Sequence, residues 1–167
     1  ILEFKGVEQI EGFVLPKARL DCLSDYFALL KNSPHRVMPT LETREVFDQS
    51  EMIALLRYFD RGEVRKRILL LRIGGNDLLS LIGMRRPVGK TIYQTPIGHV
   101  IAQLVTTFRP YGFELSAPVF EYLDDPMNLA KEVEEDLAHG LVGKTAIHPM
   151  QVPDIERQYC VGFGDVE

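Results

Sequence analysis

The sequence has little cysteine, no long hydrophobic run and no excess of positive charge. Its two cysteines, Cys22 and Cys160, lie far apart and form neither a metal-ligand spacing nor a disulfide framework, which favours a reducing, cytoplasmic location. Since no apolar run approaches membrane-spanning length, we expect no membrane association. The net charge of −5 gives nucleic acid no bulk electrostatic attraction, so we expect no nucleic-acid partner.

The length and composition are those of one globular domain. The chain has 167 residues, of which 46% are hydrophobic and 26% charged, enough for a substantial core. We therefore treat residues 1–167 as a single domain. The first residues, ILEFKGVEQIEG, have no signal-peptide pattern and no initiator methionine, so we expect the chain to belong to a longer protein.

The segment from Ile68 to Arg86 organises the rest of the chain. Its apolar run Ile68–Ile73, interrupted only by Arg72, stops at Gly74-Gly75, and Asp77 follows at once. Such a run predicts a strand buried on both faces of a parallel sheet, and ligands of these folds bind beyond the carboxyl ends of the strands. Two glycines also let a backbone or a ligand come close. Asp77 is either a site residue there or the cap of a helix starting at Leu78.

Strand and helix patterns alternate along the whole chain. The expected strands are Gly12–Leu15, Val37–Leu41, Ile68–Ile73, Leu115–Phe120 and Gly143–His148. The expected helices are Leu20–Lys31, Glu45–Phe59, Pro96–Phe108 with Thr95 as N-cap, one starting at Asp125-Pro126 and ending at Gly140, and Val152–Tyr159. This order predicts an α/β fold of five parallel βα units, either an open doubly wound sheet or part of a barrel.

Two carboxylates follow consecutive strands of the expected sheet. Glu42 ends one strand and Asp77 the next, and neighbouring parallel strands lie about 4.8 Å apart. The pair could therefore hold one hard cation such as Mg²⁺, which keeps waters and takes substrate oxygens. The alternative is that each carboxylate caps its own helix. Lys17 stands at the end of the first strand as a mouth residue or a solvated turn lysine, and His148 ends the last strand with no clustered histidine.

Two GKT triplets raise the possibility of a phosphate-binding loop. A Walker loop requires a glycine five positions before the Gly-Lys pair, but Ala138 and Met84 occupy those positions. We therefore disfavour a nucleotide-binding protein.

Four stretches together resemble the HpcH/HpaI aldolase and citrate lyase β-subunit family, whose fold is a (β/α)8 TIM barrel. Gly12–Lys17 (GFVLPK), Thr40–Thr43 (TLET) and the Asp-Leu segment in Ile73–Gly83 match in order. The most specific match is Gly143–Gln151 (GKTAIHPMQ), which is similar to the family signature Gly-Lys-x-x-Ile-His-Pro-x-Gln.

The resemblance implies a Mg²⁺-dependent carbon–carbon lyase, with Mn²⁺ as a possible substitute. Its substrate would be a 2-oxo or 3-hydroxy acid, or the coenzyme A thioester of one, cleaved through an enolate that the metal stabilises. The residues implied are Glu42 and Asp77 as metal ligands, Lys17 and His148 as catalytic residues, and Gly74, Gly75 and Lys144 as substrate-binding residues. We also expect a homo-oligomer.

The chain departs from the family at its beginning. The expected units correspond to strands four to eight, and the family's first three strands, one of which carries an active-site arginine, have no counterpart. Either a longer protein or another chain would complete the barrel, because five strands cannot close it. A non-catalytic barrel that binds a ligand or a partner is therefore the rival hypothesis.

Overall fold

A parallel β-sheet lies at the centre of the computed structural model, which describes residues 5–160. Its four strands are β1 (Gly12–Leu15), β2 (Arg36–Leu41), β3 (Leu71–Ile73) and β4 (Leu115–Ser116). They are hydrogen-bonded in the order β1-β2-β3-β4, and every neighbouring pair is parallel. A doubly wound sheet reverses its strand order, whereas a barrel wall adds strands in chain order. The sheet is therefore part of a barrel, as the sequence predicted.

Helices connect the strands. The α-helices of the described residues are α1 (Leu20–Leu29), α2 (Gln49–Phe59), α3 (Gly62–Arg67), α4 (Gly75–Leu81), α5 (Pro96–Phe108), α6 (Pro126–Ala138) and α7 (Val152–Tyr159). Short 3₁₀ helices are η1 (Val7–Gln9), η2 (Arg44–Phe47), η3 (Ile92–Gln94), η4 (Arg109–Tyr111) and η5 (Pro149–Gln151). Within residues 5–160, no helix has the length and apolar character needed to cross a membrane.

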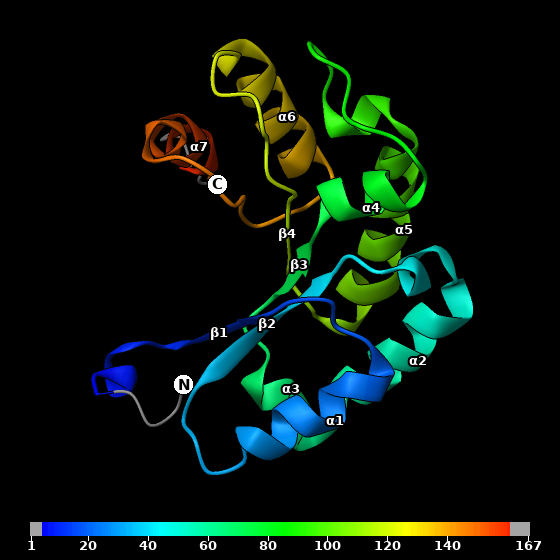
Figure 1. Cartoon of the computed structure of the whole chain (residues 1–167), viewed down its shortest axis with the longest axis vertical. Helices are drawn as coiled ribbons and strands as arrows, with labels where there is room; N and C mark the ends of the chain where they lie inside the picture. The colour runs from blue at the N-terminus through cyan, green and yellow to red at the C-terminus, as the bar shows by residue number, and fades with distance from the viewer. Residues whose placement is uncertain (1–4, 161–167) are drawn as a thin grey trace, which may run out of the picture.

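The main core lies between the sheet and the helices on one of its sides. Figure 1 shows α1, α2, α3 and α5 along the same side of the bent sheet, below and to the right of the strands. Buried residues of this core include Val37, Leu41, Leu71, Leu115, Phe59, Ile101 and Phe108. A second, smaller core joins α6 and α7 through Phe120, Leu129, Val133 and Ile155.

The start of α5 confirms the predicted N-cap Thr95, and α6 starts where predicted, with a cap of the same kind. Oγ1 of Thr95 accepts a hydrogen bond from the amide of Ile97 over 3.2 Å, and Pro96 occupies the first helical position. At α6, Oδ1 of Asp125 accepts from the amide of Asn128 over 3.2 Å. In both cases a side chain satisfies an amide that has no partner inside the helix.

The expected fifth strand, Gly143–His148, is wrong in extent. Its beginning lies beside β4, where the amide of Ala117 donates to the carbonyl of Gly143 over 2.8 Å and Ala117 forms a single parallel bridge with Lys144. The ladder stops there because the chain turns towards η5. The amide of Ile147 donates instead to Oε1 of Gln151, and Pro149 has no amide proton to give.

Several other boundaries also differ from prediction. The strand expected over Ile68–Ile73 is continuous only from Leu71, although Ile68, directly after the unexpected helix α3, forms a single parallel bridge with Val37. The helix expected over Glu45–Phe59 is split, since Asp48 caps α2 and η2 precedes it. The strand expected over Leu115–Phe120 ends at Ser116.

Candidate active site

Three candidate residues follow the carboxyl ends of three neighbouring strands. Lys17 lies two residues after β1, Glu42 directly after β2, and Asp77 in the first turn of α4, after β3. Parallel neighbours end at the same edge of a sheet, so the topology brings these residues to one face. In barrels of this class that face carries the active site.

The backbone of Lys17 is held by Glu42. The amide of Lys17 donates to Oε1 of Glu42 over 2.8 Å. Lys17 has a φ of 51°, in the left-handed region, and no other described residue except glycines has a positive φ. Such a conformation costs about 1–3 kcal/mol and persists only where neighbours impose it, most often at functional sites.

The position of Glu42 depends on Gly74. A Cβ atom on Gly74 would lie 2.4 Å from both Cβ and Oε2 of Glu42, so that any side chain there would displace the carboxylate. Gly75 is also packed closely, since its Cβ would lie 2.5 Å from Cδ1 of Ile92 and 2.8 Å from Cβ of Pro118. Packing therefore explains both glycines, and a direct contact with substrate remains a prediction.

Asp77 is not the cap that the alternative interpretation expected. Helix α4 begins at Gly75, and its N-cap residue, Gly74, makes no side-chain capping bond. Oδ1 of Asp77 lies 3.9 Å from Nζ of Lys17, with 51% of the aspartate and 69% of the lysine side chain exposed. An ion pair of this length and exposure is weak, so both groups can exchange it for a ligand.

The charged groups at these strand ends suit one type of metal. Within the described part of the chain, no three His, Cys, Asp or Glu side chains lie close enough to hold a metal ion. The available donor set is thus a pair of carboxylates. Mg²⁺ is commonly bound by one or two protein carboxylates, with waters and substrate oxygens as the remaining ligands, so the pair fits Mg²⁺.

Two further candidates, Lys144 and His148, have partners outside this group. Nζ of Lys144 is fully buried, 2.8 Å from Oε1 of Glu132 and 2.9 Å from Oδ2 of Asp136. We therefore leave Lys144 out of the proposed binding residues. His148 is exposed, and its Nδ1 accepts a hydrogen bond from the amide of Met150 over 3.2 Å at the start of η5.

Gln151, the last residue of the signature segment, also has a structural role. Its buried amide donates to the carbonyl of Phe120 over 2.9 Å and accepts from Ile147 over 3.0 Å. Much of this signature therefore fixes the course of the chain between β4 and α7.

Sequence reasoning missed a buried ion network centred on Arg86. Its guanidinium lies 2.6 Å from Oε2 of Glu132 and 3.1 Å from Oε2 of Glu121, and it also donates to the carbonyl of Val119 over 2.9 Å. The amide of Ile92 donates to the same Glu132 oxygen over 2.7 Å. The network therefore ties the 82–95 loop to α6 and to the segment after β4.

The network continues through Asp136. Burial raises the pKa of this carboxyl, although Lys144 and the hydroxyl of Tyr93 act to lower it. The Tyr93 hydroxyl donates to Oδ1 of Asp136 over 2.6 Å, and burial raises its pKa as well. One signal was available in the sequence, because Glu132 and Asp136 share a helical face with the core residues Leu129 and Val133.

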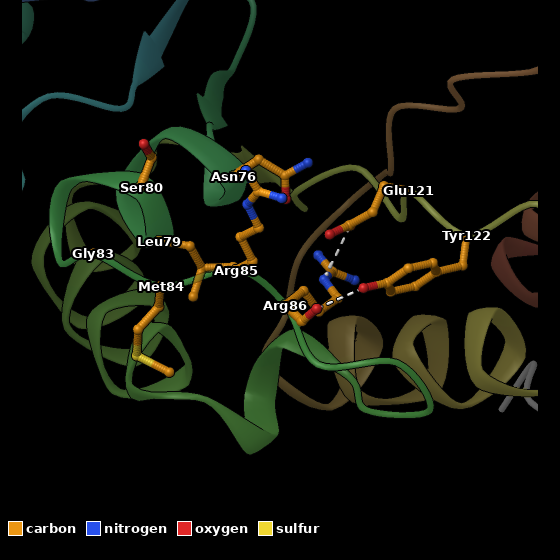
Figure 2. Close-up of a pocket in the computed structure, with 9 residues that line it drawn as sticks. All are labelled: Asn76, Leu79, Ser80, Gly83, Met84, Arg85, Arg86, Glu121 and Tyr122. Carbon is orange, nitrogen blue, oxygen red and sulfur yellow. Dashed lines mark hydrogen bonds and ion pairs between the residues drawn. The ribbon is translucent and has the colours of Figure 1, made fainter.

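An open cavity of about 520 Å³ is lined by residues of α4 and of the segments after α4 and β4, among them Asn76, which precedes Asp77 in the chain. Figure 2 shows Asn76, Leu79, Ser80 and Arg85 on one side of it, and Glu121 and Tyr122 on the other. These residues belong to the connections that follow β3 and β4.

Taken together, the fold and the strand-end residues define an α/β protein of the TIM-barrel class. The chain belongs to the family described as C-C_Bond_Lyase of the TIM-Barrel fold, whose model matches residues 1–167. A comparison with curated proteins finds no match. This match confirms the predicted carbon–carbon lyase family, and solved citrate lyase β subunits share its fold.

Solved structures of this type align with most of the chain. RipC from Yersinia pestis aligns with a TM-score of 0.76 at 19% identity, over 94% of this chain and 67% of its own. The citrate lyase β subunit from M. tuberculosis, complexed with oxaloacetate and magnesium, gives 0.65 at 22%, over 90% and 62%. A citrate lyase from Burkholderia xenovorans gives 0.74 at 17%, over 92% and 50%. At such identities the likeness establishes the fold, and the chain spans between half and two thirds of these proteins.

Proposed function

We propose that residues 1–167 form the C-terminal part of a Mg²⁺-dependent carbon–carbon lyase. Its substrate is a 2-oxo or 3-hydroxy acid, or the coenzyme A thioester of one. The observation that carries the proposal is the connection of Glu42 and Asp77 through one residue, since the amide of Lys17 is bonded to the first and its ammonium lies near the second.

The comparisons support the reaction class. The chain's family is named for carbon–carbon bond lyases, and a structural neighbour was solved with magnesium and oxaloacetate. Another neighbour from M. tuberculosis was solved with magnesium, acetoacetate and coenzyme A. Acids of this kind are carbonyl compounds whose cleavage leaves an enolate.

In this proposal Glu42 and Asp77 hold the metal. Bound Mg²⁺ supplies positive charge that stabilises the oxyanion of an enolate as the carbon–carbon bond breaks. Gly74 leaves the space that the Glu42 carboxylate occupies, because any side chain there would displace it. Mn²⁺, which prefers similar oxygen ligands, should substitute.

Lys17 and His148 are the proposed catalytic residues. The ammonium of Lys17 is 69% exposed and only loosely paired, so it can bind an acid group of the substrate. Nδ1 of His148 accepts the amide proton of Met150, which leaves the proton of the neutral ring on Nε2. In that tautomer His148 can donate a hydrogen bond from Nε2.

The test is an activity assay of the full-length protein against 2-oxo acids, 3-hydroxy acids and their coenzyme A thioesters. We expect cleavage that EDTA abolishes and that Mg²⁺ or Mn²⁺ restores. Glu42→Gln should lower kcat more than it changes KM, whereas Lys17→Met should mainly raise KM. Glu51→Gln, on the exposed surface of α2, is the matched control.

Cleavage that survives both EDTA and Glu42→Gln would rule out the mechanism. Inactivity across the whole panel, with ligands still bound, would favour the rival function of a non-catalytic binding module. The cytoplasmic location and the homo-oligomeric state remain predictions from the sequence.

A further inference from the structure

The open cavity of about 520 Å³ is bounded by two segments that follow strand ends. Asn76, Ser80 and Arg85 belong to the connection between β3 and α5, and Glu121 and Tyr122 to the connection between β4 and α6. Asn76 directly precedes Asp77, one of the proposed metal ligands. We infer from this neighbourhood that a molecule bound at Glu42 and Asp77 reaches the cavity at Asn76.

Two consecutive arginines in the cavity wall, Arg85 and Arg86, differ in exposure and in ion pairing. Arg86 has a fully buried side chain whose charge is compensated by Glu121 and Glu132 and which also donates to the carbonyl of Val119, so it is not exposed to a ligand in the cavity. The same contact compensates the charge of Glu121. Arg85 is exposed, and within residues 5–160 it makes no ion pair. Arg85 is thus the uncompensated charge of the cavity.

The fixed surroundings of Arg86 also position Arg85. The Tyr122 hydroxyl donates to the backbone carbonyl of Arg86 over 2.5 Å, and the Arg86 side chain is anchored in the network below. The residue after Arg85 is therefore fixed twice, by the hydrogen bond to its carbonyl and by the ion pairs of its side chain. Preorganisation of this kind lowers the entropic cost of binding.

The groups that line the cavity favour an anion. The guanidinium of Arg85 offers a planar fork of donors that matches a carboxylate or a phosphate, and Asn76 and Ser80 add an amide and a hydroxyl. Figure 2 shows Arg85 and Asn76 on the same side of the cavity, across from Glu121. The compensated Glu121 leaves the positive charge of Arg85 dominant.

We propose that this cavity is an anion-binding subsite in which Arg85 contacts a carboxylate or phosphate group of the substrate. The link to a substrate rests on the proposed lyase function, and it makes that substrate a compound with a second anionic group. Anion binding itself requires neither metal nor turnover. Arg85 would act as a specificity-determining residue, because it contacts a part of the substrate remote from the bond that breaks.

The experiment measures anion binding by the full-length protein in the presence of EDTA. Isothermal titration calorimetry with inorganic phosphate and, separately, with malonate distinguishes the two anions. We expect saturable binding of at least one of them. Arg85→Met should raise the Kd of that anion by about ten- to a hundredfold, since a hydrogen bond to a charged group is lost, and Arg85→Lys by less.

The matched control is Arg57→Met, which removes one exposed positive charge from α2. Its Kd should equal that of the wild type. Absence of saturable binding, an unchanged Kd in Arg85→Met, or an equal loss in Arg57→Met would each overturn the subsite. This titration measures binding, whereas the assay of the proposed function measures turnover, so the two proposals can fail separately. Saturable anion binding by a protein that is inactive across the substrate panel would support the subsite and count against the lyase. Lyase activity without saturable anion binding would overturn the subsite alone.

Discussion

The amide of Lys17 donates a hydrogen bond to Oε1 of Glu42 over 2.8 Å, and this bond joins the ends of two neighbouring strands. It holds Lys17 in a left-handed conformation that residues with side chains seldom adopt. The ammonium of the same residue lies 3.9 Å from Asp77, beyond the third strand. A single residue thus contacts both carboxylates on which the proposed chemistry depends.

The left-handed backbone of Lys17 predicts opposite effects of two substitutions. Lys17→Gly should be at least as stable as the wild type, because glycine adopts a positive φ without steric cost. Lys17→Val should lose about 1–3 kcal/mol, since a β-branched residue is strained there. Thermal unfolding of the two variants measures the difference. If valine were tolerated as well as glycine, the conformation of Lys17 would not be imposed by its neighbours.

Close packing at Gly74 predicts a loss of both stability and metal affinity in Gly74→Ala. The added methyl group would meet Cβ and Oε2 of Glu42, and such overpacking costs about 1–3 kcal/mol. Gly62→Ala is the control, because a Cβ there meets no atom within 4 Å. Chemical denaturation and Mg²⁺ titration of both variants provide the measurement. Unchanged Mg²⁺ affinity in Gly74→Ala would show that Glu42 is not held as described.

The buried network predicts a large effect of Lys144→Met on stability. The substitution leaves Glu132 and Asp136 buried without their shared cation, and breaking a buried pair costs about 3–5 kcal/mol. Lys66→Met removes an exposed cation paired with Glu63 and should leave the stability close to that of the wild type. Urea denaturation at neutral pH compares the two variants. Similar small losses would contradict a buried network.

The loss in Lys144→Met should also depend on pH. Burial raises the pKa of Asp136 above its ordinary value, and removal of Lys144, which lowers it, raises it further. Between the ordinary and the raised pKa the folded state binds more protons than the unfolded state, so stability falls as the pH rises through that window. The destabilisation should therefore be smaller below the raised pKa of Asp136 than at neutral pH. A loss that does not become smaller as the pH is lowered would contradict this.

The strand ends could be predicted from the sequence because each buried strand is marked locally. The apolar run before Gly74 and the carboxylates after two successive strands are visible in the chain, and the parallel order follows from the alternation of strands and helices. This is why the positions of Glu42 and Asp77 relative to the sheet were correct. Their common link to Lys17 was not visible, because it depends on the conformation of one turn.

The roles of the signature residues could not be predicted from their identity. Lys144 was assigned to substrate, but the structure buries its ammonium between Glu132 and Asp136. The sequence shows that a lysine is present and does not show which carboxylates from α6 lie against it. Similarly, the different environments of Arg85 and Arg86 depend on packing between distant segments.

Mg²⁺ binding by the full-length protein tests the central claim most directly. Isothermal titration calorimetry should show saturable binding to the wild type and to the control Glu51→Gln. Glu42→Gln and Asp77→Asn should each weaken binding by at least about tenfold, because each removes a charged oxygen ligand. If both variants bound Mg²⁺ as tightly as the wild type, Glu42 and Asp77 would not be the metal ligands, and the proposed lyase mechanism would be wrong.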